Sequence, residues 1–114
     1  MDNCLFCRII KGEIPSTKVY EDEYVYAFKD INPATPVHVL VVPKVHIDSL
    51  EGLNDKNIEN VVHIHRGIKK VADITRISKE GYRVIVNCGE GAGQTVFHLH
   101  YHVLGGRKMN EKII

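Results

Sequence analysis

The 114-residue sequence lacks an excess of charge of either sign. Lysine and arginine together number 15 and aspartate and glutamate 14, so the formal net charge is +1 at neutral pH. Proteins dedicated to DNA binding neutralise many phosphates with a surplus of basic residues. This balance argues against a nucleic-acid partner, and any recognition of phosphate has to be local.

Long hydrophobic runs are also missing. A membrane-spanning helix needs roughly 20 predominantly apolar residues in succession, and no segment approaches that length. The segment Met1-Asp2-Asn3-Cys4 contains no basic stretch followed by an apolar one, so we expect no signal peptide. These absences predict a protein without a membrane partner.

Cysteine is scarce, with three residues at Cys4, Cys7 and Cys88. An odd number without a secretion signal favours reduced thiols over a disulfide framework, so we expect a cytoplasmic location. We interpret Cys88 as a small buried residue. Cys4 and Cys7 form a Cys-x-x-Cys pair, which in a cytosolic chain indicates metal or redox chemistry. The redox interpretation expects a preceding strand, and a closed zinc site needs two further ligands.

The hydrophobic pattern predicts a single α+β domain over residues 1–114, built on a five-stranded, largely antiparallel sheet. We expect a short helix over residues 4–11 and one long helix from Asn54 or Asp55 to Ile74, with Asp55 as its cap. Prolines predict a loop over residues 30–36, and glycines predict another over residues 89–93. The expected strands cover residues 18–20, 24–29, 37–42, 82–87 and 96–104.

Three histidines, His98, His100 and His102, alternate with other residues along the last expected strand. Successive side chains of a strand point to opposite faces, so the three imidazoles should share one face. The other face should pack on the core through Phe97, Leu99, Tyr101 and Val103. Such a row of imidazoles is costly to keep for stability alone, so it indicates function; the alternative is a histidine-rich exposed strand without a role.

Such a row suits a metal site, acid–base catalysis near neutral pH, or nucleophilic attack on phosphorus. A metal site wants a third ligand nearby, often a carboxylate, and no acid closely follows His102. The glycine-rich segment and the pair Gln94-Thr95 precede the row and supply donors for a phosphate or its transition state. The pattern therefore favours the nucleophilic interpretation.

The segment His98-Leu99-His100-Tyr101-His102-Val103-Leu104 resembles the His-φ-His-φ-His-φ-φ pattern, with φ apolar, of the histidine-triad (HIT) family of nucleotide hydrolases and transferases. The resemblance extends over nearly the whole chain, and the ending Val103-Leu104-Gly105-Gly106-Arg107 is similar to the Hint branch rather than the Fhit branch. It implies a HIT-like fold and a homodimer whose sheet continues across the interface. The animal Hint pattern has a tryptophan near the C-terminus that reaches the partner's active site. This chain has no tryptophan, which leaves the leaving-group preference open.

The resemblance also implies roles for individual residues. His100 would attack the α-phosphate and form a nucleotidyl-histidine intermediate that water then cleaves. His102 would contact the phosphate, His98 would position the nucleophile, His38 would support this network, and Asp30 would bind the ribose hydroxyls. An apolar slot for a purine would consist of Phe6, Ile9, Phe28 and Ile31. The remaining nucleotide contacts would be Asn87, Gly93, Gln94 and Thr95.

Zinc-bearing members of the family use the histidine of a Pro-x-x-His-Ile segment and the first histidine of the triad. Those residues here are His46 and His98, which with Cys4 and Cys7 would form a structural zinc site. The alternative is a pair of buried free thiols. Elsewhere, His63 and His65 lie about 200° apart around the long helix, so we interpret both as surface residues.

The leading functional prediction is hydrolysis of purine nucleoside phosphoramidates, with adenosine monophosphoramidate as the model substrate and AMP or GMP as bound nucleotides. One alternative is a dinucleoside polyphosphate hydrolase of the Fhit type, which uses the same nucleophile. The other is a nucleotide-binding regulatory module without catalysis, against which the complete triad argues. No cofactor other than structural zinc is expected.

Overall fold

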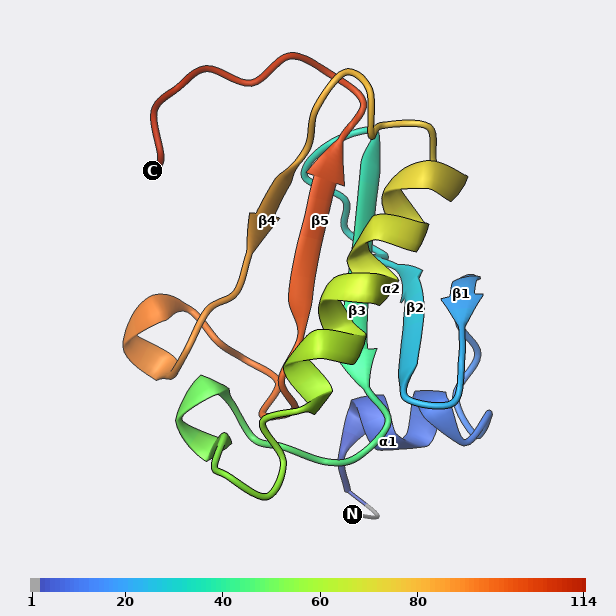
Figure 1. Ribbon diagram of the computed structural model, residues 1–114, viewed down its shortest axis with the longest axis vertical. Helices are drawn as coiled ribbons and strands as arrows, with labels where there is room; N and C mark the ends of the chain where they lie inside the picture. Colours follow the sequence, from blue (N-terminus) through green and yellow to red (C-terminus); the bar gives the residue numbers. More distant parts are fainter. Residues whose placement is uncertain (1–2) are drawn as a thin grey trace.

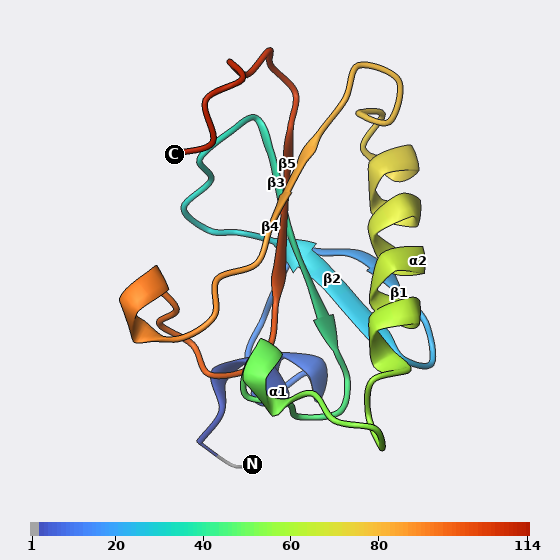
Figure 2. The same cartoon turned by 60° about the vertical axis from the view of Figure 1, so that its left-hand side comes forward.

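The computed structural model describes residues 3–114, and its centre is a sheet covered on one face by the helix α2 (Figures 1 and 2). Every pair of neighbouring strands is antiparallel, in the order β1-β2-β3-β5-β4. The predicted α+β class with a five-stranded antiparallel sheet is confirmed. The strands are β1 (Lys18–Glu21), β2 (Val25–Lys29), β3 (Val37–Pro43), β4 (Arg83–Ile85) and β5 (Tyr101–Gly105).

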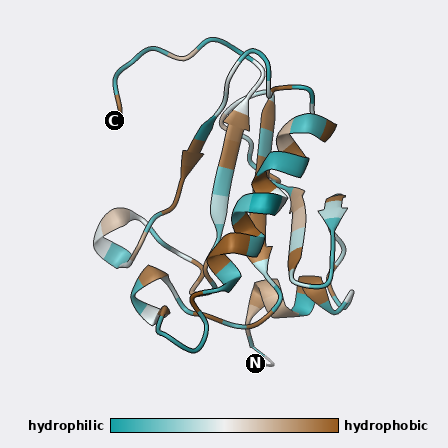
Figure 3. Ribbon diagram, viewed as in Figure 1, coloured by the Kyte–Doolittle hydropathy of each residue, from teal (hydrophilic) through white to brown (hydrophobic). Residues whose placement is uncertain are grey.

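The helix α2 (Asn60–Ile74) packs on the sheet through one apolar face. Ile64, Ile68 and Val71 are buried there against the strands. Gly67 lets the helix approach β2 closely, because a Cβ at this position would lie 3.0 Å from Val25 Cγ2. Hydrophobic and hydrophilic segments recur from turn to turn along α2, as a helix with one buried face requires (Figure 3). No helix within residues 3–114 has the length and apolar character needed to cross a membrane.

The opposite face of the sheet carries the short helix α1 (Leu5–Ile10), at the foot of β2 and β3 in Figure 1. Phe6 and Ile9 of α1 pack with Phe28, Leu40 and Val42 in a second, smaller apolar cluster. Because β3 faces α2 on one side and this cluster on the other, it is buried on both faces. The smaller cluster borders the side of the sheet that carries the candidate site.

The predicted start of the long helix is wrong, since α2 begins at Asn60. Turns occupy residues 55–59, and the Asn60 N–H donates to the Asn57 carbonyl in the tighter i→i+3 pattern, at 3.0 Å. Asp55 does not cap this entry. The N-cap of α2 is Glu59, which makes no capping side-chain hydrogen bond. Asn54 closes the preceding turn, because its Oδ1 accepts the N–H groups of Lys56 and Asn57 at 2.8 and 3.2 Å.

The predicted start of the last strand is also wrong, since β5 begins at Tyr101. The ladder to β3 ends at the pair Val41 and Tyr101, and the Leu99 N–H donates instead to the Ile47 carbonyl, 2.6 Å away. The strand β3 ends at Pro43, which has no N–H to extend the ladder. Two of the three triad histidines therefore precede the strand.

Two burial predictions fail in the same region. Phe97 is 47% exposed instead of packed on the core, because the chain before residue 101 does not alternate as a strand. Cys88 is half-buried rather than buried. It follows β4, which covers only residues 83–85 of the predicted 82–87.

Candidate functional site

The three triad histidines do not form an exposed row. His98 is completely buried, His100 is 8% exposed and His102 is half-buried. His100 and His102 line a cavity beside α1, whereas the His98 ring contacts a pair of cysteines. Residues 98–100 do not have strand geometry, and the three rings therefore have different neighbours.

A backbone contact fixes the tautomer of the neutral His100 ring. Its Nδ1 lies 2.7 Å from the His98 carbonyl oxygen, which can only accept, so Nδ1 carries the proton. Burial lowers the pKa of His100, because desolvation disfavours the imidazolium. The ring is therefore neutral near pH 7, and its Nε2 retains the lone pair that a nucleophile needs.

A chain of donors orients His102. The Ala34 N–H donates to His38 Nδ1 at 3.0 Å, so the proton of a neutral His38 sits on Nε2. That Nε2–H donates to His102 Nδ1 at 2.9 Å, with Asp30 Oδ2 3.4 Å from the same nitrogen. Burial lowers the pKa of His102 to about 4, so its ring is neutral with the proton on Nε2. His102 is thereby left with a donor that can serve an anionic ligand.

The cavity beside these histidines has a volume of about 370 Å³ and a largely apolar wall. It lies between α1, β2, β3 and the loop that follows β2. Eight of the predicted nucleotide contacts line this cavity, called the slot below. They are Phe6, Ile9, Phe28, Asp30, Ile31, Thr95, His100 and His102.

Three predicted contacts, Gln94, Asn87 and Gly93, lie outside the slot. Gln94 is 3% exposed, and its Oε1 accepts the Gly89 N–H at 2.8 Å. Its Nε2 donates to two backbone carbonyls, so its amide closes the glycine-rich loop. Thr95 is thus the one residue of the Gly93-Gln94-Thr95 segment that reaches the slot.

Sequence reasoning missed several lining residues, of which Leu40 could have been found. Leu40 lies opposite His102 in the β3–β5 register and two residues after His38, on the same face of the strand. Ile14 and Ser16, which also line the slot, follow α1 in an irregular segment. Nothing in the local sequence pattern predicts that these two residues line the slot.

The second feature is a compact cluster of Cys4, Cys7, His46 and His98, called the Cys/His cluster below. One possible ligand atom from each residue lies within 4.8 Å of the others. Cys7 Sγ is 3.4 Å from His46 Nδ1 and 3.5 Å from His98 Nδ1, and Cys4 Sγ is also 3.5 Å from His98 Nδ1. Tetrahedral zinc, with bonds of about 2.3 Å to sulfur and 2.0–2.1 Å to nitrogen, separates such atoms by about 3.5 Å. The spacing suits a zinc ion.

The outer contacts of the two rings also fit a metal. His98 Nε2–H donates to the Pro43 carbonyl at 2.8 Å, and His46 Nε2–H donates to Asp48 Oδ1 at 2.7 Å. Each Nδ1 therefore has a lone pair for a cation, in the manner of metal-bound histidines. Burial raises the pKa of the Cys7 thiol, and a bound dication would favour the thiolate instead. The four predicted ligands thus lie together with the chemistry that zinc prefers.

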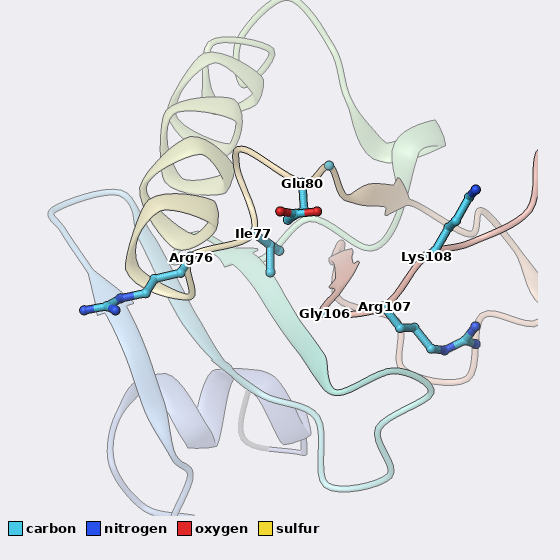
Figure 4. A pocket seen from close by; sticks show the side chains of 7 residues that line it. Arg76, Ile77, Glu80, Gly106, Arg107 and Lys108 are labelled. Carbon is cyan, nitrogen blue, oxygen red and sulfur yellow. The ribbon is translucent and has the colours of Figure 1, made fainter.

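A larger cavity of about 570 Å³ lies beside the end of α2 and the end of β5. Its wall includes Arg76, Glu80 and Arg107, and no histidine or cysteine among the described residues lines it. The Arg76 and Arg107 side chains extend away from one another (Figure 4). With no groups converging on its centre, this cavity is not a candidate for the chemistry.

An antiparallel five-stranded sheet, a covering helix and a triad whose last two histidines face an apolar slot define the class of histidine-triad folds. The HIT domain family model matches residues 11–109. The chain therefore belongs to the HIT family.

Relatives agree with this assignment over most of their length. The solved structure of a HIT family hydrolase from Clostridium thermocellum superposes on this protein with a TM-score of 0.98 and 56% sequence identity. The match covers 100% of this chain and 99% of that one. A histidine triad protein from Clostridium difficile is 54% identical with a TM-score of 0.93, over 98% and 96% of the two chains. The 14 kDa zinc-binding protein of Zea mays is 49% identical over 109 residues, covering 93% of this chain and 84% of its own.

Proposed function

We propose that this HIT-family protein is a hydrolase that cleaves purine nucleoside phosphoramidates at the α-phosphate, through a nucleotidyl intermediate on His100. The contact that supports this most directly is the bond from His100 Nδ1–H to the His98 carbonyl at 2.7 Å. It leaves Nε2 as the free lone pair of a ring that lines the slot. The hydrolase named among the relatives has the same fold.

The slot suits a purine nucleotide such as AMP or GMP. The rings of Phe6 and Phe28 meet edge to face with centroids 5.4 Å apart, and they offer an apolar surface to the base. Asp30, in the loop after β2 that lines the slot, takes the ribose hydroxyls. The α-phosphate then lies within reach of His100 and His102.

The reaction follows as two displacements. His100 Nε2 attacks phosphorus and forms a P–N bond, while the bond to the leaving amine breaks and the amine takes up a proton from solvent. The Nε2–H of His102 donates to a phosphate oxygen as negative charge develops. Water then attacks the phosphorus and releases one proton to solvent, the P–N bond to His100 breaks, and the nucleoside monophosphate leaves.

A neighbouring cavity of about 360 Å³ favours an amine over a polyphosphate as the leaving group. It adjoins the slot at Leu5, Thr95 and Val96 and continues past Phe97. No lysine or arginine lines it among the described residues. A dinucleoside polyphosphate hydrolase would have to hold several bridging phosphate charges there, so it is the second candidate.

The stereochemical course at phosphorus tests the proposal. With a substrate made chiral at the α-phosphorus, two successive displacements predict overall retention of configuration. Inversion would show a single displacement by water and would overturn the intermediate on His100. Absence of turnover with phosphoramidates and dinucleoside polyphosphates, together with tight AMP binding, would instead identify a regulatory binding module.

We assign the Cys/His cluster to a zinc ion with a structural role. A zinc held by four protein ligands has no open position for water, so when bound it ties α1 to the segment before β5 and takes no part in hydrolysis. The three free cysteines suit the reducing cytoplasm. Metal analysis of protein purified without chelator should find one zinc per chain.

We further propose a homodimer in which a second copy continues the sheet along β4. Within the described chain β4 is the last strand of the sheet, and its Val84 is 39% exposed. Unpaired edges of this kind are sites of strand pairing between copies. Light scattering should give twice the mass of the chain, and the chain's own mass would exclude the dimer.

A further inference from the structure

The short helix α1 belongs to both parts of the site. Cys7 lies within it and Cys4 is its N-cap, and both belong to the Cys/His cluster. Phe6 and Ile9, on the same helix, line the slot. A helix of six residues is too short to persist by itself, so tertiary contacts decide where these side chains lie.

Phe6 connects the Cys/His cluster to the proposed nucleophile. It stands between the two cysteines in sequence, and its ring meets the rings of His98 and His100 edge-on, with centroids 6.0 and 5.1 Å apart. Cys4 Sγ also accepts the Cys7 N–H at 3.4 Å and so caps α1. The sulfurs that reach His46 and His98 therefore hold the wall of the slot in place.

We propose, on the basis of the slot and the metal site assigned above, that Cys4 and Cys7 are redox-sensitive positioning residues for nucleotide binding. Their oxidation by a peroxide releases the metal and loosens α1, so that Phe6 and Ile9 no longer form a fixed wall against the base. Reduction in the presence of zinc restores the slot. The protein would thus bind nucleotide tightly only while this cysteine pair is reduced.

The chemistry is balanced with hydrogen peroxide as the oxidant. The two thiolates lose two electrons and form one S–S bond. The O–O bond of the peroxide accepts these electrons and breaks, and its two oxygens take up two protons from solvent to give two water molecules. The zinc, having lost two of its four ligands, leaves as the dication. Cys4 is half-buried and lines the cavity of about 360 Å³ next to the slot, which gives a peroxide a path to the pair.

The experiment treats zinc-loaded protein with hydrogen peroxide and follows three quantities that do not depend on turnover. We expect release of one zinc per chain to a metallochromic indicator, loss of two thiols, and a rise of about ten- to a hundredfold in the Kd for AMP by calorimetry. Dithiothreitol with zinc should reverse all three. The matched control is Cys88→Ser, whose thiol lies outside the Cys/His cluster and whose response should equal that of the wild type.

A second variant links the effect to the slot wall. Phe6→Ala should weaken AMP binding in the reduced protein, and peroxide should then weaken it less than in the wild type, because both changes remove the Phe6 contact. Additive losses would overturn the proposed route through α1. So would zinc release with an unchanged Kd for AMP, or a peroxide response that disappears in Cys88→Ser.

The proposed hydrolysis is tested independently of the redox response. Reduced, zinc-loaded protein that binds AMP without hydrolysing phosphoramidates would refute the enzyme but leave this redox response measurable. Normal hydrolysis with an AMP affinity that peroxide does not alter would refute the redox role alone.

Discussion

The proton on His100 Nδ1 has the His98 carbonyl as its acceptor, and this contact leaves the opposite nitrogen free to react. We therefore expect His100→Ala to lower phosphoramidate turnover about a thousandfold or more. The base and ribose contacts remain, so the Kd for AMP should stay within about tenfold. The matched control is His65→Ala, an exposed histidine on α2, which should keep full activity. Substantial activity in His100→Ala would exclude it as the nucleophile.

We expect Asp30 to contribute mainly to nucleotide binding. Its Oδ1 accepts the Asn32 N–H at 2.8 Å, which holds the carboxylate in the loop that lines the slot. Loss of a hydrogen bond to a charged acceptor costs about 1.5–3 kcal/mol, so Asp30→Ala should raise KM roughly ten- to a hundredfold.

A nucleotide without ribose hydroxyls provides the control. The wild-type enzyme should bind a 2′,3′-dideoxynucleotide as weakly as Asp30→Ala binds the normal one, and the variant should lose nothing further. Additive losses would mean that Asp30 does not contact the ribose.

The end of β5 depends on how closely it approaches the chain that follows α2. A Cβ on Gly105 would lie 2.9 Å from Ile77 Cδ1 and 3.1 Å from Ile77 Cβ, so the buried Ile77 side chain would have to shift. Gly105→Ala should therefore lower the free energy of unfolding by about 1–3 kcal/mol in urea titrations. Gly91→Ala is the matched control, because a Cβ there meets nothing within 4 Å and its effect should stay within about 0.5 kcal/mol. Equal effects would show that the β5 contact tolerates the methyl group.

The buried histidines make the stability of the whole molecule depend on pH. Burial lowers the pKa of His102 from 6.5 to about 4, so between these values the unfolded chain binds more protons than the folded one. Stability from this group is fully present above about pH 6.5 and is lost as the pH falls toward 4. We expect the unfolding midpoint in urea to decrease between about pH 7 and pH 5, and to decrease less in His102→Gln. An equal decrease in both proteins would show that His102 is not responsible.

The types of secondary-structure element and the residues that can carry chemistry follow from the sequence alone. Apolar spacing places the long helix and five strands, because these patterns reflect which face of each element is buried. The alternation of His98, His100 and His102, the Cys4-x-x-Cys7 pair and the family pattern indicate the reactive groups before any contact is known. The family assignment and the antiparallel α+β fold are confirmed on these grounds.

Only the tertiary structure decides where those groups meet. Cys4 reaches His98 across 94 positions of sequence, and the last strand begins at Tyr101 because the β3 ladder stops there. That stop turns His98 toward the cysteines while its carbonyl remains the partner of His100. Gln94 is likewise turned inward by backbone partners that its own sequence neighbourhood does not reveal. Local pattern predicts the type of each element, because it reflects which face is buried. Strand register and long-range packing determine which side chains line the slot and which gather in the Cys/His cluster.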